Sequence, residues 1–73
     1  MSVTLLRQVW GIVEETQAKV LLKLDDTDLV EQLLSQLSSR STLSTEEVTH
    51  VQTYIDSRIS LIRDLAQARL VQA

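Results

Sequence analysis

His50 is the only histidine in the chain, and imidazole is the side chain that most often transfers protons near neutral pH. It falls on the polar side of a helical pattern with Glu46 one turn before it, an ordinary pairing on a helix surface. Acyl transfer also needs a nucleophile held by an oriented base, and no spacing in the chain suggests one. The single glycine, Gly11, excludes a glycine-rich phosphate loop. We therefore expect no enzyme and no cofactor.

Asp25, Asp26 and Asp28 form the densest group of possible metal ligands. A calcium loop places acids at alternating positions, followed by a glycine and a distal glutamate, and this segment has neither. If Asp25 is the N-cap of a helix, Asp28 stands at its third position, where a carboxylate stabilises the helix start. With one histidine and no cysteine, a structural zinc is also disfavoured. The sequence predicts no metal site.

Two arginines interrupt an apolar pattern near the C-terminus. Arg58 falls between Tyr54 and Leu61 on that face, and Arg69 repeats the placement three turns later. An unpaired buried charge is strongly unfavourable, so each guanidinium must extend outward along its aliphatic stem or meet a carboxylate. We expect Arg58 to bond a carboxylate or a helix-end carbonyl, within the fold or across a dimer seam. Alternatively, Arg58 recognises an acidic group on another protein.

Three segments repeat apolar residues at steps of three and four, which predicts three helices. The first covers about residues 3–24, the second about 26–38 and the third about 45–71. Between the second and third, a short run rich in serine and threonine surrounds Arg40 and predicts a plain connector. Phosphorylation of that run is the alternative. The fold class is therefore all-α, with a long, a short and a long helix.

The first predicted helix has two irregular places. Gly11 lies inside it, and we expect a tolerated or closely packed glycine rather than a kink. Thr16 and Gln17 interrupt its apolar face halfway along. Trp10 lies on the flank of that face with Leu21, where it either completes the core or anchors a partner.

The third helix has the clearest start and the widest apolar face. Ser44 and Glu47 have the spacing of a capping box, with Leu43 and Val48 placed to pack as a hydrophobic staple. Two apolar lines then run side by side along the helix. The first line contains Val48, Val51, Ile55, Ile59, Ile62, Ala66 and Leu70, and the second Tyr54, Leu61, Leu65 and Ala68. Together they are wider than one packing partner requires.

The chain has 73 residues, enough for one domain, residues 1–73, with a core that is marginal at this size. It has no cysteine for a disulfide, so association of copies is the remaining common way to stabilise it. We expect an antiparallel three-helix arrangement that is completed as a helical bundle by dimerisation. The interface candidates are Trp10, Leu21, Tyr54, Arg58, Leu61, Leu65 and Arg69.

A net charge of −3 disfavours attraction to nucleic acids and to anionic membranes, because both depend on a positive field. No apolar run approaches the roughly 20 residues of a membrane span, and no signal peptide is recognisable, so we expect a cytoplasmic protein. The leading hypothesis is a non-enzymatic interaction, adaptor or regulatory protein that binds a second copy or another protein. The alternative is a DNA-binding regulator in which the second and third helices form a helix-turn-helix.

Overall fold

The computed structural model describes residues 2–72, with side chains described through residue 71. All regular structure in this range is helical. Its five helices are α1 (Val3–Glu15), α2 (Ala18–Lys23), α3 (Asp26–Arg40), α4 (Thr45–Ser57) and α5 (Ile59–Gln72). The all-α prediction is therefore confirmed, whereas two of the three predicted helices are each divided in two.

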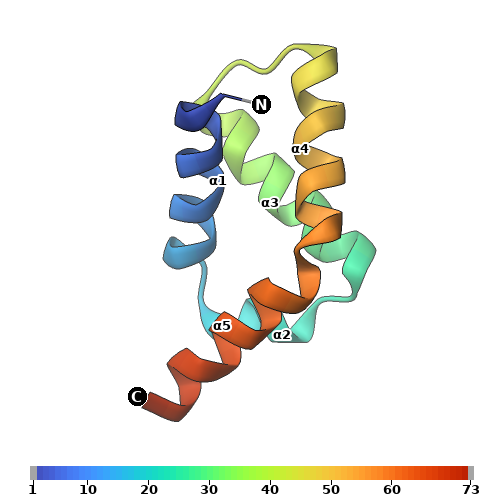
Figure 1. Cartoon of the computed structure of the whole chain (residues 1–73). Coiled ribbons are helices and arrows are strands. Elements are labelled where there is room, and N and C mark those ends of the chain that lie inside the picture. The colour runs from blue at the N-terminus through green and yellow to red at the C-terminus, as the bar shows by residue number, and fades with distance from the viewer. Residues whose placement is uncertain (1, 73) are drawn as a thin grey trace.

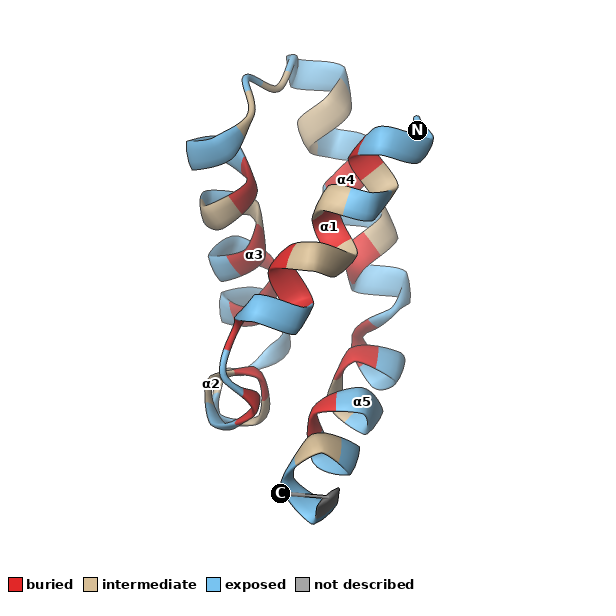
Figure 2. Ribbon diagram, turned by 90° about the vertical axis from the view of Figure 1, so that its left-hand side faces the viewer, coloured by how far each residue is buried: buried red, intermediate tan, exposed pale blue. Residues whose placement is uncertain are grey.

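The helices form two groups that meet end to end. In the first group, α1 and α4 both pack against α3, and in the second, α2 packs against α5 (Figure 1). The described residues occupy about 37 × 21 × 19 Å. Figure 2 shows the buried segments of α1, α3 and α4 facing one another, while those of α5 turn toward α2. One continuous apolar core joins the two groups, formed by Leu5, Val9, Ile12, Val13, Ala18, Leu21, Leu29, Val30, Leu33, Leu37, Val51, Ile55, Ile59, Ile62 and Ala66.

The first predicted helix, residues 3–24, ends at Glu15 and restarts at Ala18. The buried Thr16 has extended backbone angles, and its hydroxyl donates a hydrogen bond of 2.7 Å to the Ile12 carbonyl. A hydroxyl that bonds back to the preceding turn competes with the backbone ladder and favours a bend or an end. Gly11 lies within α1 without interrupting it.

The third predicted helix, residues 45–71, is interrupted at Arg58. The Ser57 hydroxyl donates to the Tyr54 carbonyl at 2.7 Å, and the Arg58 amide bonds the Ile55 carbonyl, three residues back, at 2.9 Å. This tightened turn ends α4, and α5 continues in a new direction beneath α1 (Figure 1). The expected single helix, and with it a plain long–short–long arrangement, is therefore wrong in this detail.

The local signals at the helix starts are confirmed. Ser44 and Glu47 form the reciprocal capping box, with bonds of 3.0 and 3.1 Å between backbone amides and side chains. Asp25 caps α3 by accepting from the Asp28 amide at 2.8 Å. The second predicted helix continues two residues past residue 38, to Arg40, whose guanidinium pairs with Glu15 at the end of α1. This exposed ion pair joins the C-terminal residues of α1 and α3.

Candidate association surface

The two apolar lines of the third predicted helix have different environments. The middle of the first line is buried against the core, from Val51 of α4 to Ala66 of α5. The second line is only partly covered, since Tyr54 is half-buried and Leu61 and Leu65 are each 44% exposed. The other three helices therefore cover one edge of this face and leave the other edge in contact with solvent.

A direct contact between Trp10 and Tyr54 joins α1 to α4. The indole Nε1 of Trp10 donates to the Tyr54 hydroxyl at 2.8 Å, and the two rings pack edge to face with centroids 6.2 Å apart. Both side chains are half-buried and pack against the core. The polar end of each ring is thus satisfied by the other, while part of each apolar ring faces outward.

Arg58 is exposed and lies at the C-cap of α4 rather than inside an apolar helix face. Its guanidinium lies over the Tyr54 ring, 5.2 Å from the ring centroid, and donates to the Ser57 hydroxyl at 3.3 Å. Among the described residues it bonds neither a carboxylate nor a helix-end carbonyl. The cation–π contact holds its charge against the aromatic pair.

The bond to helix-end carbonyls that the sequence predicted for Arg58 is made by Arg69 instead. Arg69 donates to the carbonyl oxygens of Val13 and Thr16, at 3.2 and 2.8 Å, where α1 ends. These are carbonyls near a helix end that lack a partner within the helix. Arg69 therefore fastens α5 to the break between α1 and α2.

Arg63 has a comparable position on the other side of α5. It donates to the Leu21 carbonyl of α2 at 3.2 Å and to the Asp26 carboxylate at 2.7 Å. Arg63 was not among the residues that the sequence singled out. The helix pattern carried no signal for it, because both of its partners lie about 40 residues earlier in the chain and reach it only through the fold.

A groove of about 320 Å³ runs between α1 and α5. Its lining combines apolar side chains with one acid and one arginine: Trp10, Val13, Glu14, Leu65, Ala68 and Arg69. Through this groove and the Arg58–Tyr54–Trp10 contacts, five of the seven interface candidates meet on neighbouring parts of α1, α4 and α5, and the exposed Leu61 lies one helical turn before Leu65 on α5. We call this set, Trp10, Tyr54, Arg58, Leu61, Leu65 and Arg69, the association surface.

Leu21 is the interface candidate that lies elsewhere. Its side chain is 0% exposed and belongs to the core between α2 and α5. The sequence grouped Leu21 with Trp10 because one continuous helix would place them on the same flank. The break at Thr16 and Gln17 changes the direction of the chain, so α2 presents Leu21 to α5 instead.

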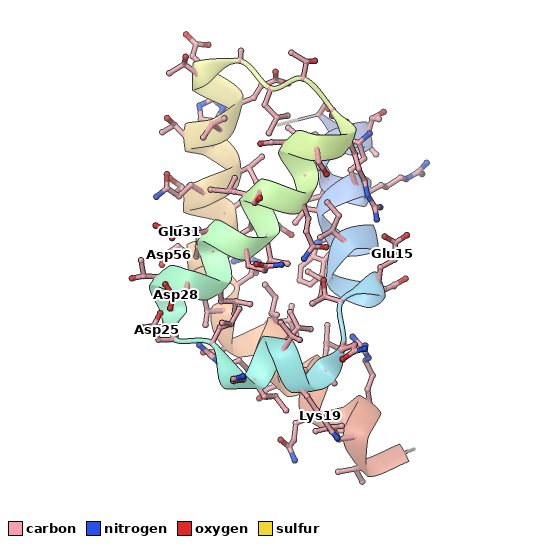
Figure 3. All side chains as sticks on the ribbon, turned by 180° about the vertical axis from the view of Figure 1, so that it is seen from behind. Glu15, Lys19, Asp25, Asp28, Glu31 and Asp56 are labelled. Atoms are coloured by element: carbon pink, nitrogen blue, oxygen red, sulfur yellow. The ribbon has the colours of Figure 1, made fainter. Side chains whose placement is uncertain are left out.

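A second hollow of about 320 Å³ lies between α3 and α4 and is more polar. It is lined by Thr27, Val30, Glu31, Gln52, Thr53 and Asp56. Figure 3 shows Glu31 and Asp56 on the same side of the molecule as Asp25 and Asp28 at the start of α3. Even so, no three acidic or histidine side chains in residues 2–71 converge closely enough to hold a metal ion.

Two further observations concern the remaining sequence predictions. His50 is exposed on α4, and its side chain forms no hydrogen bond with any side chain or backbone group in residues 2–71. Over the described part of the chain, no helix combines the length and apolar character that crossing a membrane would require.

No protein-family model, curated protein or solved structure matches this chain. The candidate surface therefore has to be interpreted from its own geometry.

Proposed function

We propose that this chain is a small non-enzymatic interaction protein that acts as a homo-oligomeric helical bundle, associating through the association surface. The observation that carries the proposal is the uncovered apolar edge formed by Leu61 and Leu65 beside the Trp10–Tyr54 pair. Tryptophan, tyrosine and arginine are the residue types most enriched among the side chains that dominate protein–protein binding energies. All three meet on this surface, and its groove offers a partner side chain a place to insert.

Energetic considerations favour the same conclusion. A 73-residue chain has a small core, and covering apolar surface with a second copy adds to it. Covering the exposed part of each leucine contributes on the order of 1 kcal/mol per side chain. Leu61 and Leu65 of two copies would together supply several such contributions, in addition to those of the aromatic rings. Adaptor and regulatory proteins need no more than such a stable, specific surface.

The test is the molar mass in solution of the wild type and of a Leu65→Glu variant. We expect the wild type to be a dimer at micromolar concentration by light scattering, and Leu65→Glu to be a folded monomer, because its carboxylate would be desolvated in the interface. Val71→Glu is the matched control, since Val71 is a 76% exposed apolar residue of the same helix outside the surface. A monomeric wild type would overturn the proposal. The proposal would also be overturned if Leu65→Glu and Val71→Glu lowered the molar mass in solution to the same extent.

A further inference from the structure

Glu14 and Arg58 occupy matching positions on opposite flanks of the association surface. α1 and α4 run in the same direction (Figure 1), and the Trp10–Tyr54 hydrogen bond places those two residues at the same level. Glu14 follows Trp10 by four residues, and Arg58 follows Tyr54 by four. One turn beyond the aromatic pair, the α1 flank therefore carries the Glu14 carboxylate, in the same groove as Arg69, whose guanidinium is held by the Val13 and Thr16 carbonyls, and the α4 flank carries the Arg58 guanidinium.

Neither Glu14 nor Arg58 forms an ion pair with another described residue. The ion pairs present among these residues join Arg40 to Glu15 and Arg63 to Asp26. Glu14 is exposed at the edge of the groove, and Arg58 is exposed over the Tyr54 ring. Both side chains therefore remain available to an opposite charge that approaches from outside.

The exposed apolar residues of α5 run from the start of the helix, just after Arg58, into the groove that Glu14 lines. Leu65 lines the groove together with Glu14, and Leu61 follows Arg58 by three residues. The surface thus has an apolar strip bordered by an acid on one side and a base on the other. This is the usual anatomy of an interface, with an apolar centre and a charged rim.

Opposite charges on opposite flanks are what a twofold interface requires. When a copy is rotated by 180° about an axis that lies in the interface along α1 and α4, each flank comes to face the other flank of its partner. Glu14 then meets the partner subunit's Arg58, and Arg58 meets the partner subunit's Glu14. The same rotation brings the strip of Leu61 and Leu65 against its own copy.

We propose that two copies of this chain dock face to face about such an axis, with two reciprocal Glu14–Arg58 ion pairs bordering a shared apolar strip. This inference rests on the proposed self-association and adds its partner, its symmetry and its register. The charged rim rejects orientations that would bring like charges together, whereas the apolar strip supplies most of the attraction.

Charge reversal tests the register directly. Glu14→Arg gives two arginine pairs in the homodimer, and Arg58→Glu gives two glutamate pairs, so we expect each variant to dimerise about tenfold more weakly or worse in sedimentation equilibrium. The double variant Glu14→Arg/Arg58→Glu restores both attractive pairs and should dimerise as the wild type does. An equimolar mixture of the two single variants should form a heterodimer, because each copy then supplies the charge that the other needs.

Asp56→Arg and Lys19→Glu are the controls, because they change the net charge by the same amounts at exposed positions outside the surface. Both should dimerise like the wild type. A dimer that is insensitive to the Glu14 and Arg58 reversals, or single variants that fail to associate with each other, would overturn the inference while the proposed self-association stands. A monomeric wild type would overturn both and would leave the surface for a different protein.

Discussion

At the scale of single residues, arginine side chains replace hydrogen bonds that the divided helices cannot make for themselves. Arg69 bonds two carbonyls near the end of α1, and Arg63 bonds one at the end of α2. Both project from α5, on either side of the buried line that contains Ile62. A planar guanidinium suits this position, because its several N–H groups can reach two acceptors at once.

The contribution of Arg69 can be measured by an Arg69→Met substitution, which keeps the apolar stem and removes the donors. We expect the free energy of unfolding to fall by about 1–2 kcal/mol, because two partly buried carbonyls lose their charged donor. Urea denaturation followed by circular dichroism gives the value. Arg7→Met is the control, since the Arg7 side chain is exposed on α1 and its guanidinium forms no hydrogen bond or ion pair with the described residues. Equal losses in the two variants would contradict a specific role for Arg69.

At the scale of the helices, a hydroxyl residue lies at each of the two places where a predicted helix is interrupted. Thr16 and Ser57 each donate to a carbonyl of the preceding turn, with bonds of 2.7 Å, and each adjoins the end of a helix. The resulting short helices let α2 pack against α5 and let α1 and α4 pack against α3. Because α5 departs from the line of α4, Leu65 lines a groove with Trp10 and Glu14 of α1 instead of continuing a single straight face along α4.

Gly11 allows a test at this scale. It lies in the interior of α1, and a Cβ built there meets no atom within 4 Å. Gly11→Ala should therefore raise the free energy of unfolding by about 0.5–1 kcal/mol, because alanine loses less backbone entropy in a helix. Thermal or urea unfolding at a fixed protein concentration measures the gain. Ser35→Ala on the exposed side of α3 is a comparison from which we expect a smaller gain, and a destabilised Gly11→Ala would indicate a packing role for the glycine.

At the scale of the whole molecule, the distribution of charge bears on the alternative function. In the helix-turn-helix hypothesis α3 and α4 would face DNA, yet their first turns carry Asp26, Asp28, Glu46 and Glu47. Such acids stabilise helix starts but repel phosphates. The hollow between these two helices adds Glu31 and Asp56.

A heparin column distinguishes the two functions at this scale. We expect the protein to flow through at low salt, because its net charge of −3 and the acidic α3–α4 side give a polyanion nothing to bind. A basic protein retained under the same conditions is the positive control. Retention that weakens steeply with added salt would favour the DNA-binding alternative over the interaction protein.

Local features of the fold could be predicted from the sequence alone. The capping box at Ser44 and the N-cap at Asp25 join residues only three positions apart, so their geometry follows from the sequence spacing. The all-helical class follows likewise from apolar periodicity. The same periodicity identified Leu61 and Leu65 as members of a second apolar line. Because one neighbouring helix covers only a limited width of a helix face, this second line was expected to remain partly uncovered.

Tertiary structure decided the two helix breaks and the arginine contacts. Threonine and serine also occur inside uninterrupted helices. Whether a helix ends at such a residue therefore depends on whether the segments before and after it pack better against the rest of the chain in different directions. Arg69 reaches the Val13 and Thr16 carbonyls across more than 50 positions of sequence, and Leu21 turns into the core only because α2 has left the line of α1. Periodicity shows which residues share a face of one helix. Which of these faces pack against each other depends on the arrangement of all the helices in the folded chain.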